Sequence, residues 1–186
     1  MKRRLTLLFA ALALTLAASP LAHAQHLSGT TAVHEYYNPN YNVKDHFYTT
    51  QFDLCFDYET YEYFPCTIST NWQYQRVAYY AFTTQQTGTV RFHRYWNPNL
   101  GDHFWTTDIN ELGYYPGNNW QYETQDPLYV YTSAQTGTVP LYRYYHWENA
   151  DHLYTIDPNE LGDGTFDNAP GYAGWIYEGV AGYVSP

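Results

Sequence analysis

Basic residues are scarce in this chain of 186 residues, which has 8 Lys and Arg against 18 Asp and Glu and a formal net charge of −10. Lys2, Arg3 and Arg4 precede an apolar run, "LTLLFAALALTLAA", which is followed by "AHA". A positive start, a short apolar stretch and a small-residue cleavage site are typical of a secretory leader. We therefore expect residues 1–24 to be a signal peptide and the protein to be secreted, either extracellular or periplasmic.

A second long apolar run is missing after this leader, so we expect no membrane-spanning segment. Removing the leader leaves five basic residues against eighteen acidic ones. A chain this acidic repels the phosphates of nucleic acids and of anionic lipid surfaces. We expect neither nucleic acid nor membrane as a partner, and we expect residues 25–186 to form one monomeric domain.

Cysteine is also rare, and the chain has only Cys55 and Cys66. In an exported protein two such residues are expected to form a disulfide. Two thiols at this spacing do not make a metal site, and we predict neither a metal nor a cofactor. The sequence lacks the GxSxG and HExxH patterns and a Cys–His pair of the kind that carries catalysis. We therefore predict that the protein is not an enzyme.

Aromatic residues are abundant, with 23 Tyr and 6 Trp. Tyrosine is enriched in β-strands, which explains part of this excess. Tyrosine and tryptophan also combine a broad apolar face with a polar group, which suits a surface that stacks on sugar rings. A composition this aromatic argues against disorder.

Internal repetition is the main feature of the chain. The pattern Asp-His-apolar-aromatic-Thr occurs three times, as "KDHFYTT", "GDHFWTT" and "ADHLYTI". Each copy is followed by a similar motif, "NWQYQ", "NWQYE" or "GWIYE". Self-similarity of this kind indicates a fold built from repeated units. We place the repeats at about 31–89, 90–138 and 139–186.

Each repeat contains four short segments rich in aromatic or β-branched residues and bounded by turn residues, which predicts four strands. The segments "DINELG" and "DPNELG" add one predicted helical turn, with Asp as N-cap. Three units that cannot bury their own faces favour an all-β fold, a β-trefoil with a closed barrel. A small β-propeller is the alternative.

The motifs "LYRYY", "DHLYT", "DPNELG" and "GWIYEGVAGYV" resemble an uncharacterised repeat family of secreted bacterial and fungal proteins. Its members are similar to "LYRxYNPxxGDHFYTT…GWxYEGxAGYV" and often stand beside cell-wall hydrolases or peptidases. The resemblance covers nearly the whole chain after the leader. It implies secretion and an accessory role directed at glycans, and it implies no established activity.

The Asp-His strand is the candidate site. Alternation along a strand places Phe47, Phe104 and Leu153 toward the core and the histidines and following rings outward. An outward ring beside histidine and a carboxylate suits sugar binding. The sequence therefore predicts a secreted, non-catalytic, lectin-like module that binds a glycan or cell-wall polysaccharide. The predicted ligand-binding residues are Asp45, His46, Tyr48, Asp102, His103, Trp105, Asp151, His152 and Tyr154.

Three other interpretations stay open at this point. In a structural role, Arg94 and Arg143 would pair with the Asp of their own repeats, whereas Glu35 would face Asp45 in repeat one. In a metal site, the three histidines would converge on zinc. In a protein-binding module, an inhibitor or adhesin, the segment "DYETYEYFP" between the cysteines would be the reactive loop.

Overall fold

The structure is a computed structural model that describes residues 26–40, 43–51, 54–57, 62–65, 72–161 and 174–186. The predicted signal peptide and Cys66 lie outside these ranges, so the leader and the Cys55–Cys66 disulfide stay predictions. All regular secondary structure in the described ranges is β-strand. These ranges contain no helix of the length and apolarity that crossing a membrane requires.

Eleven strands are described, and each repeat has a first, a second and a last strand in the same order. The first strands are β1 (Thr31–Asn40), β6 (Thr89–Asn97) and β9 (Val139–His146). The second strands are β2 (Val43–Thr49), β7 (Asp102–Thr106) and β10 (Asp151–Thr155). The last strands are β5 (Gln73–Ala81), β8 (Gln121–Tyr131) and β11 (Trp175–Val184). Repeat one adds β3 (Leu54–Asp57) and β4 (Glu62–Pro65).

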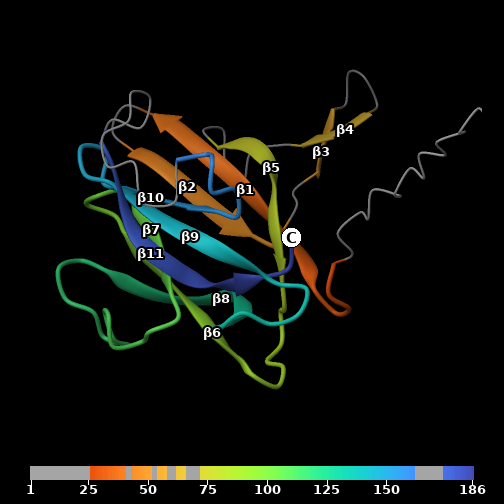
Figure 1. Cartoon of the computed structure of the whole chain (residues 1–186). Helices are drawn as coiled ribbons and strands as arrows, with labels where there is room; N and C mark the ends of the chain where they lie inside the picture. Colours follow the sequence, from red (N-terminus) through yellow and green to blue (C-terminus); the bar gives the residue numbers. More distant parts are fainter. Residues whose placement is uncertain (1–25, 41–42, 52–53, 58–61, 66–71, 162–173) are drawn as a thin grey trace, which may run out of the picture.

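In every repeat the first strand lies between the second and the last, and all pairs are antiparallel. Repeat one forms the sheet β2-β1-β5, and repeats two and three share the sheet β10-β9-β11-β8-β6-β7 (Figure 1). The prediction of an all-β fold is confirmed. The sheets of the described residues are open, and the closed barrel expected of a trefoil is not formed by them.

The prediction of four strands per repeat is wrong, because the expected third and fourth strands are one continuous strand. Register shifts in β5, β8 and β11 let each strand bend without ending. In β8 the irregularity includes Asp126, whose φ of 49° is tolerated because Asp can adopt the left-handed region. Pro127, which has no N–H to donate to a ladder, lies in the same irregularity.

The predicted helical turn is a hydrogen-bonded turn. The Asn110 N–H donates to Asp108 Oδ1 at 2.9 Å, as expected of an N-cap, and the Gly113 N–H donates to the Ile109 carbonyl at 2.7 Å. Gly113 has a φ of 80°, which favours glycine and ends the turn. The same cap recurs at Asp157 and Asn159 in repeat three, where the N–H···Oδ1 distance is also 2.9 Å.

The core lies where β2, β7 and β10 meet, because these three strands contact one another. Their central rings, Tyr48, Trp105 and Tyr154, pack edge to face with centroids 5.5–5.7 Å apart. The Tyr154 hydroxyl donates to the Trp105 carbonyl at 2.7 Å, and the Tyr48 hydroxyl accepts from the Tyr154 N–H at 2.9 Å. These bonds satisfy the Tyr154 hydroxyl, the Tyr154 N–H and the Trp105 carbonyl at the centre of the core.

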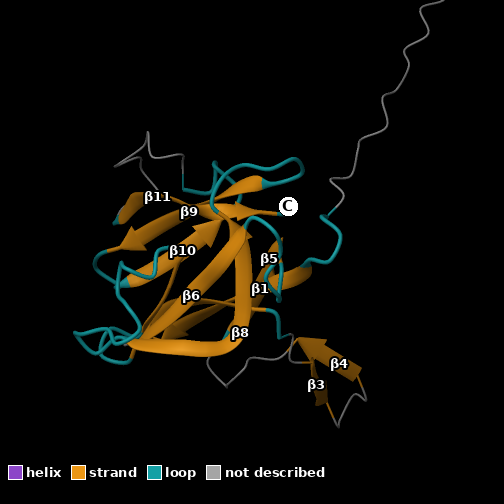
Figure 2. Ribbon diagram, turned by 90° about the horizontal axis from the view of Figure 1, so that it is seen from below, coloured by secondary structure: helices purple, strands orange, loops and turns teal. Residues whose placement is uncertain are grey.

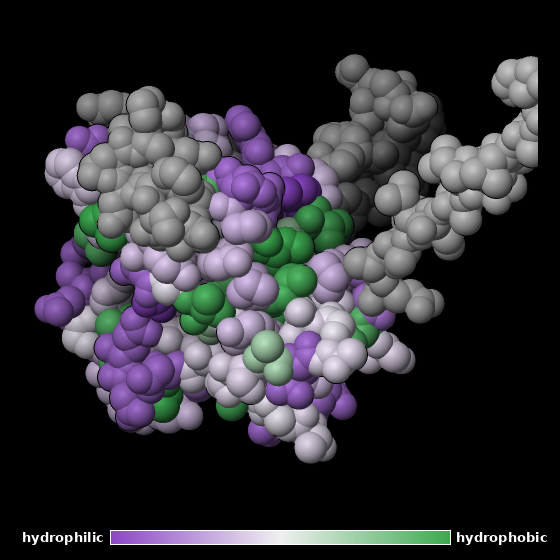
Figure 3. Space-filling model, in the orientation of Figure 1, coloured by the Kyte–Doolittle hydropathy of each residue, from purple (hydrophilic) through white to green (hydrophobic). Residues whose placement is uncertain are grey.

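The three repeats are also tied together at one end. Tyr183 of β11 pairs with Tyr131 of β8, and the Tyr80 N–H donates to the Ser185 carbonyl at 2.9 Å. Figure 2 shows the strands of the three repeats gathered around a common centre, with the β3–β4 hairpin apart from them. Figure 3 shows apolar side chains near the middle of one face, surrounded by polar ones.

Candidate binding sites between the repeats

Three buried aspartates link the repeats at the site, because each one binds the histidine of the next repeat. Asp102 accepts from the His152 N–H at 3.1 Å, and its other oxygen lies 2.7 Å from His152 Nδ1. Asp45 binds His103 in the same way, at 3.0 and 2.5 Å. Asp151 binds His46 at 2.9 and 2.8 Å. The pattern is a closed ring in which every repeat is linked to both others.

The aspartates also face one another, with one carboxylate oxygen of each lying within 4.8 Å of the others. Among the described residues this is the one group with the geometry for a metal ion. Both oxygens of each carboxylate already bind a histidine, and the group is explained by these bonds alone. The three histidines do not form such a group in the described ranges, so the structure gives no support to a zinc site made by them.

Burial and mutual repulsion set the protonation of this ring. Burial raises the pKa of Asp45 well above its ordinary value, and the charges of Asp102 and Asp151 raise it further. Burial also raises the pKa of Asp102, against the opposing effect of His152. Three buried carboxylates this close repel one another when charged, and the direction of both shifts favours the protonated carboxyl.

The histidines respond to the charge of their partners. Burial lowers the pKa of His103 to about 3, and Arg94 acts in the same direction against the opposing charge of Glu123. Burial also opposes the charged form of His46, but the Asp151 carboxylate and then Glu35 outweigh it and raise the pKa of this imidazole. The shifts therefore favour the neutral forms of His103 and Asp45 and the charged form of His46 beside Asp151.

The outer nitrogen of each histidine lies near a glutamate. The distance from Nε2 to the carboxylate is 3.5 Å for His152 and Glu178, 4.0 Å for His103 and Glu123, and 3.9 Å for His46 and Glu35. An arginine holds each glutamate at 2.7–2.9 Å: Arg143 for Glu178, Arg94 for Glu123 and Arg76 for Glu35.

Aromatic rings flank the histidines. Directly opposite each histidine on the first strand stands a ring, and the centroids are 4.6 Å apart for Tyr37 and His46, 4.3 Å for Trp96 and His103, and 4.7 Å for Tyr145 and His152. A tryptophan of the preceding repeat approaches from the other side. Trp175 lies 6.1 Å from His46, and Trp72 lies 6.1 Å from His103.

We name each arrangement by its histidine: the His46, His103 and His152 sites. The His152 site is a pocket of about 290 Å³ at the junction of repeats two and three, lined by Leu100, Asp102, Trp120, Tyr145, His152 and Glu178. Trp120 and Tyr145 are both partly exposed. The pocket therefore offers two rings, an imidazole and a carboxylate to a ligand from solvent.

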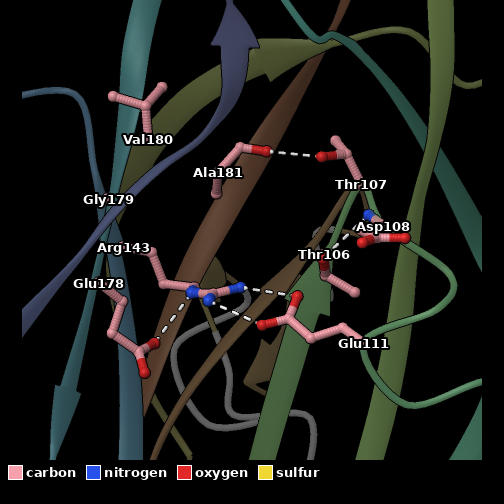
Figure 4. Close-up of a pocket in the computed structure, with 9 residues that line it drawn as sticks. All are labelled: Thr106, Thr107, Asp108, Glu111, Arg143, Glu178, Gly179, Val180 and Ala181. Carbon is pink, nitrogen blue, oxygen red and sulfur yellow. Dashed lines mark hydrogen bonds and ion pairs between the residues drawn. The ribbon is translucent and has the colours of Figure 1, made fainter.

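A second, more polar pocket of about 180 Å³ lies on the other side of Glu178. Figure 4 shows Arg143 between two carboxylates, with Nε 2.9 Å from Glu178 and Nη2 2.9 Å from Glu111. Arg76 binds Glu35 and Glu160 in the same manner. The Glu of the "NELG" turn thus reaches the arginine of the following repeat, and this inter-repeat ion pair lines the pocket.

The structure keeps only part of the predicted site together. The three Asp–His pairs lie in the sites, but the prediction that the following rings face outward is wrong: Tyr48 and Trp105 are 1% exposed and Tyr154 is 0% exposed. The alternation rule assumes one solvated face, whereas β7 and β10 are covered on both. Of the residues predicted to face the core, Phe104 and Leu153 are buried and Phe47 packs against the core.

The rings that do flank the histidines were missed by reasoning from the sequence. They are Tyr37, Trp96, Tyr145, Trp72, Trp120 and Trp175. The recurring Trp of "NWQY" and "GWIY" was a visible signal, since a tryptophan repeated in three units needs a common role. Its placement beside the next repeat's histidine depends on the packing between repeats.

The predicted pairing of arginine with aspartate is also wrong. Arg94 and Arg143 bind glutamates of the last strand, because Arg94 faces Glu123 across the sheet and Glu178 lies in a bulge beside Arg143. Glu35 does not oppose Asp45 but binds Arg76. Lys44, which precedes Asp45, donates to Asn149 Oδ1 at 3.1 Å.

The predicted reactive loop of an inhibitor falls partly on β3 and β4, which form a two-stranded hairpin. Residues 58–61 between them lie outside the described ranges, as does Cys66. The hairpin stands apart from the other strands in Figure 1. Its use as a protein-binding loop stays a prediction.

Comparison with known families gives one match. The model of a family described as a domain of unknown function, DUF5648, matches residues 55–185. This range includes the Asp-His motifs of repeats two and three, and it leaves out β1 and β2 of repeat one. No curated protein and no solved structure matches the chain.

Proposed function

The chain belongs to the DUF5648 family, and from this premise we propose that it is a secreted, non-catalytic module that binds glycans. The ligand is a cell-wall or other extracellular polysaccharide, and the binding surface is the set of His46, His103 and His152 sites. The rings that contact sugar are the flanking Trp and Tyr residues rather than the buried rings of the second strands.

One observation carries this proposal: the same combination of ring, tryptophan, histidine and glutamate occurs at all three junctions between repeats. A sugar site needs an apolar surface for the face of the pyranose and a few polar groups for its hydroxyls. Trp120 and Tyr145 supply the first, and His152 Nε2 and Glu178 supply the second. Three weak sites on one module give avidity for a polymer.

The architecture fits this role because three pseudo-equivalent units are arranged around one axis. We regard a small propeller-like arrangement as the better description, since the second strands β2, β7 and β10 meet at the centre. In such an arrangement the junctions between units face solvent, where a polymer can reach more than one site.

A glycan array probed with the purified protein tests the proposal, followed by calorimetry with the best oligosaccharide. We expect Tyr145→Ala to weaken binding roughly tenfold, by analogy with the 1–3 kcal/mol that a base stacked on an aromatic ring contributes. Tyr115→Ala is the matched control, because Tyr115 is 99% exposed and lies outside the three sites. Equal affinity of the two variants would contradict the placement of the site, and an array without any bound glycan would favour a protein partner.

A further inference from the structure

The lining of the His152 site has a one-sided charge. It contains two carboxylates, Asp102 and Glu178, and no lysine or arginine. The neighbouring Arg143 does not balance them, because this single cation binds both Glu178 and Glu111. With an acidic chain around it, the pocket favours a ligand that carries positive charge.

We propose that the His152 site binds a sugar unit with a protonated primary amine, an amino sugar without its acetyl group, in preference to neutral or acidic sugars. This inference rests on the proposed glycan-binding function and names its ligand class. The amine lies against Glu178, and the pyranose face lies on Trp120 and Tyr145.

Each part of the pocket suits this ligand. A primary ammonium group has three N–H donors, and the Glu178 carboxylate has free acceptor capacity on the side away from Arg143. Cations are also attracted to the faces of Trp and Tyr. The protein already uses this attraction nearby, where the Arg143 guanidinium lies 4.8 Å from the centroid of Phe104.

The buried carboxylate behind the pocket supports the same conclusion. Burial raises the pKa of Asp102, which shows that its charged form is incompletely compensated by His152. A cation in the pocket stabilises that charged form. A quaternary ammonium group would gain from the rings alone, since it has no N–H to donate to Glu178.

The test is calorimetry of the purified protein at pH 6 with four ligands: a glucosamine hexamer, its fully N-acetylated counterpart, cellohexaose and choline. We expect the glucosamine hexamer to bind at least tenfold more tightly than the other three. We also expect its affinity to fall as salt is raised from 50 to 500 mM, because the interaction is electrostatic.

Glu178→Gln and Glu111→Gln form a matched pair of variants, since both glutamates bind Arg143 but only Glu178 lines the pocket. Glu178→Gln is expected to reduce the preference for the glucosamine hexamer at least tenfold, with Glu111→Gln close to the unsubstituted protein. Near-ultraviolet circular dichroism verifies that both are folded.

The outcomes separate this inference from the proposed function. If the acetylated or neutral hexamer binds as well as the glucosamine hexamer, the inference is overturned and glycan binding stands. If choline binds as tightly, the site recognises a quaternary ammonium group and the inference is equally overturned. If no sugar binds here or on the array, the proposed function fails together with it. Equal losses in both glutamine variants would mean that the effect is transmitted through Arg143, and would also overturn the assignment.

Discussion

Glu35 and Arg76 form an ion pair of 2.7 Å in which the two charges have exchanged strands relative to the other repeats. In repeats two and three the arginine is on the first strand, as Arg94 and Arg143, and the glutamate is on the last. Despite the exchange, Glu35 still lies 3.9 Å from His46 Nε2. The contact between glutamate and histidine is thus kept in all three sites, while the strand that supplies the glutamate is not.

The first prediction concerns variants of repeat one that place the arginine on the first strand and the glutamate on the last, as in repeats two and three. Glu35→Arg alone places two cations opposite each other beside His46, and we expect it to destabilise the fold. The double variant with Arg76→Glu is expected to recover most of this loss, because Arg at position 35 can reach Glu160 as Arg143 reaches Glu111. Denaturation of both single variants and the double variant gives a coupling energy, expected at about 0.5–3 kcal/mol in favour of the pair. A coupling near zero would contradict the exchange.

The ring of aspartates provides the second prediction, since its members differ in charge. The raised pKa of Asp45 favours its protonated form, and Asn reproduces a protonated carboxyl in size and in its ability to bind His103. Asp151 is the ionic partner of His46, and Asn removes that charge. We expect Asp45→Asn to change the free energy of unfolding little and Asp151→Asn to cost about 1.5–3 kcal/mol, the range for hydrogen bonds to charged groups.

Chemical denaturation of the two asparagine variants at pH 7 makes this comparison. The two variants carry the same Asp-to-Asn substitution at buried positions. Unequal losses in the free energy of unfolding therefore report the difference in protonation between the two carboxyl groups. Equal losses, or a larger loss for Asp45→Asn, would show that the proton does not reside on Asp45.

Stability should also depend on pH. The raised pKa values of Asp45 and His46 mean that the folded state holds these protons more tightly, so their contribution is complete at low pH and is lost as pH rises through the folded pKa values. His103, with its pKa lowered to about 3, has the opposite sign, and its contribution is lost on acidification below about 6.5. The two effects oppose each other in mildly acidic solution, and only the first acts above pH 6.5.

We therefore expect the melting temperature to fall between pH 6.5 and pH 9. The free energy decreases by about 1.4 kcal/mol for each pH unit over which one group is protonated only in the folded state. Calorimetric melting at constant ionic strength measures this change. The slope should be smaller in Asp151→Asn, which removes the carboxylate that raises the pKa of His46, whereas a melting temperature that is constant or rises over this range would contradict the assignment.

Much of the fold was accessible from the sequence, and the reasons for the failures are specific. Repetition and strand propensity correctly predicted an all-β protein, whereas the position of the Asp-His motif at the junctions was not predicted. The outward orientation of Trp105 failed because a strand at the centre of three units has no solvated face. The partners of the aspartates were also inaccessible, since His152 and Asp102 are 50 residues apart and meet only through packing between repeats.

The disulfide is the fourth prediction. We expect Cys55 and Cys66 to be joined in the exported protein, because they are the only two cysteines and an oxidising compartment favours their pairing. Mass spectrometry of a non-reduced digest identifies the linked peptides. Closing this short loop contributes roughly 3 kcal/mol in the chain-entropy picture, so reduction should lower the melting temperature. Alkylation of two free thiols in the native protein would contradict the bond.

Trp105 and Trp120 separate the core from the proposed surface. Trp105 is 1% exposed between Tyr48 and Tyr154, and truncation of a buried tryptophan commonly costs about 3–5 kcal/mol. We therefore expect Trp105→Ala to lower the free energy of unfolding by about this amount, and Trp105→Phe, which retains a ring, by clearly less. Trp120→Ala truncates a partly exposed side chain, and it should change the free energy of unfolding by no more than about 1 kcal/mol.

Binding should show the reverse order. Because Trp120 lines the His152 site, its loss is expected to weaken sugar binding, whereas folded Trp105→Phe should bind as the unsubstituted protein does. Denaturation curves and calorimetry on the same three preparations give both quantities for each variant. If fully folded Trp105→Phe binds sugar more weakly, this would indicate that the sugar contacts the second strand. It would also mean that the core opens to admit the sugar.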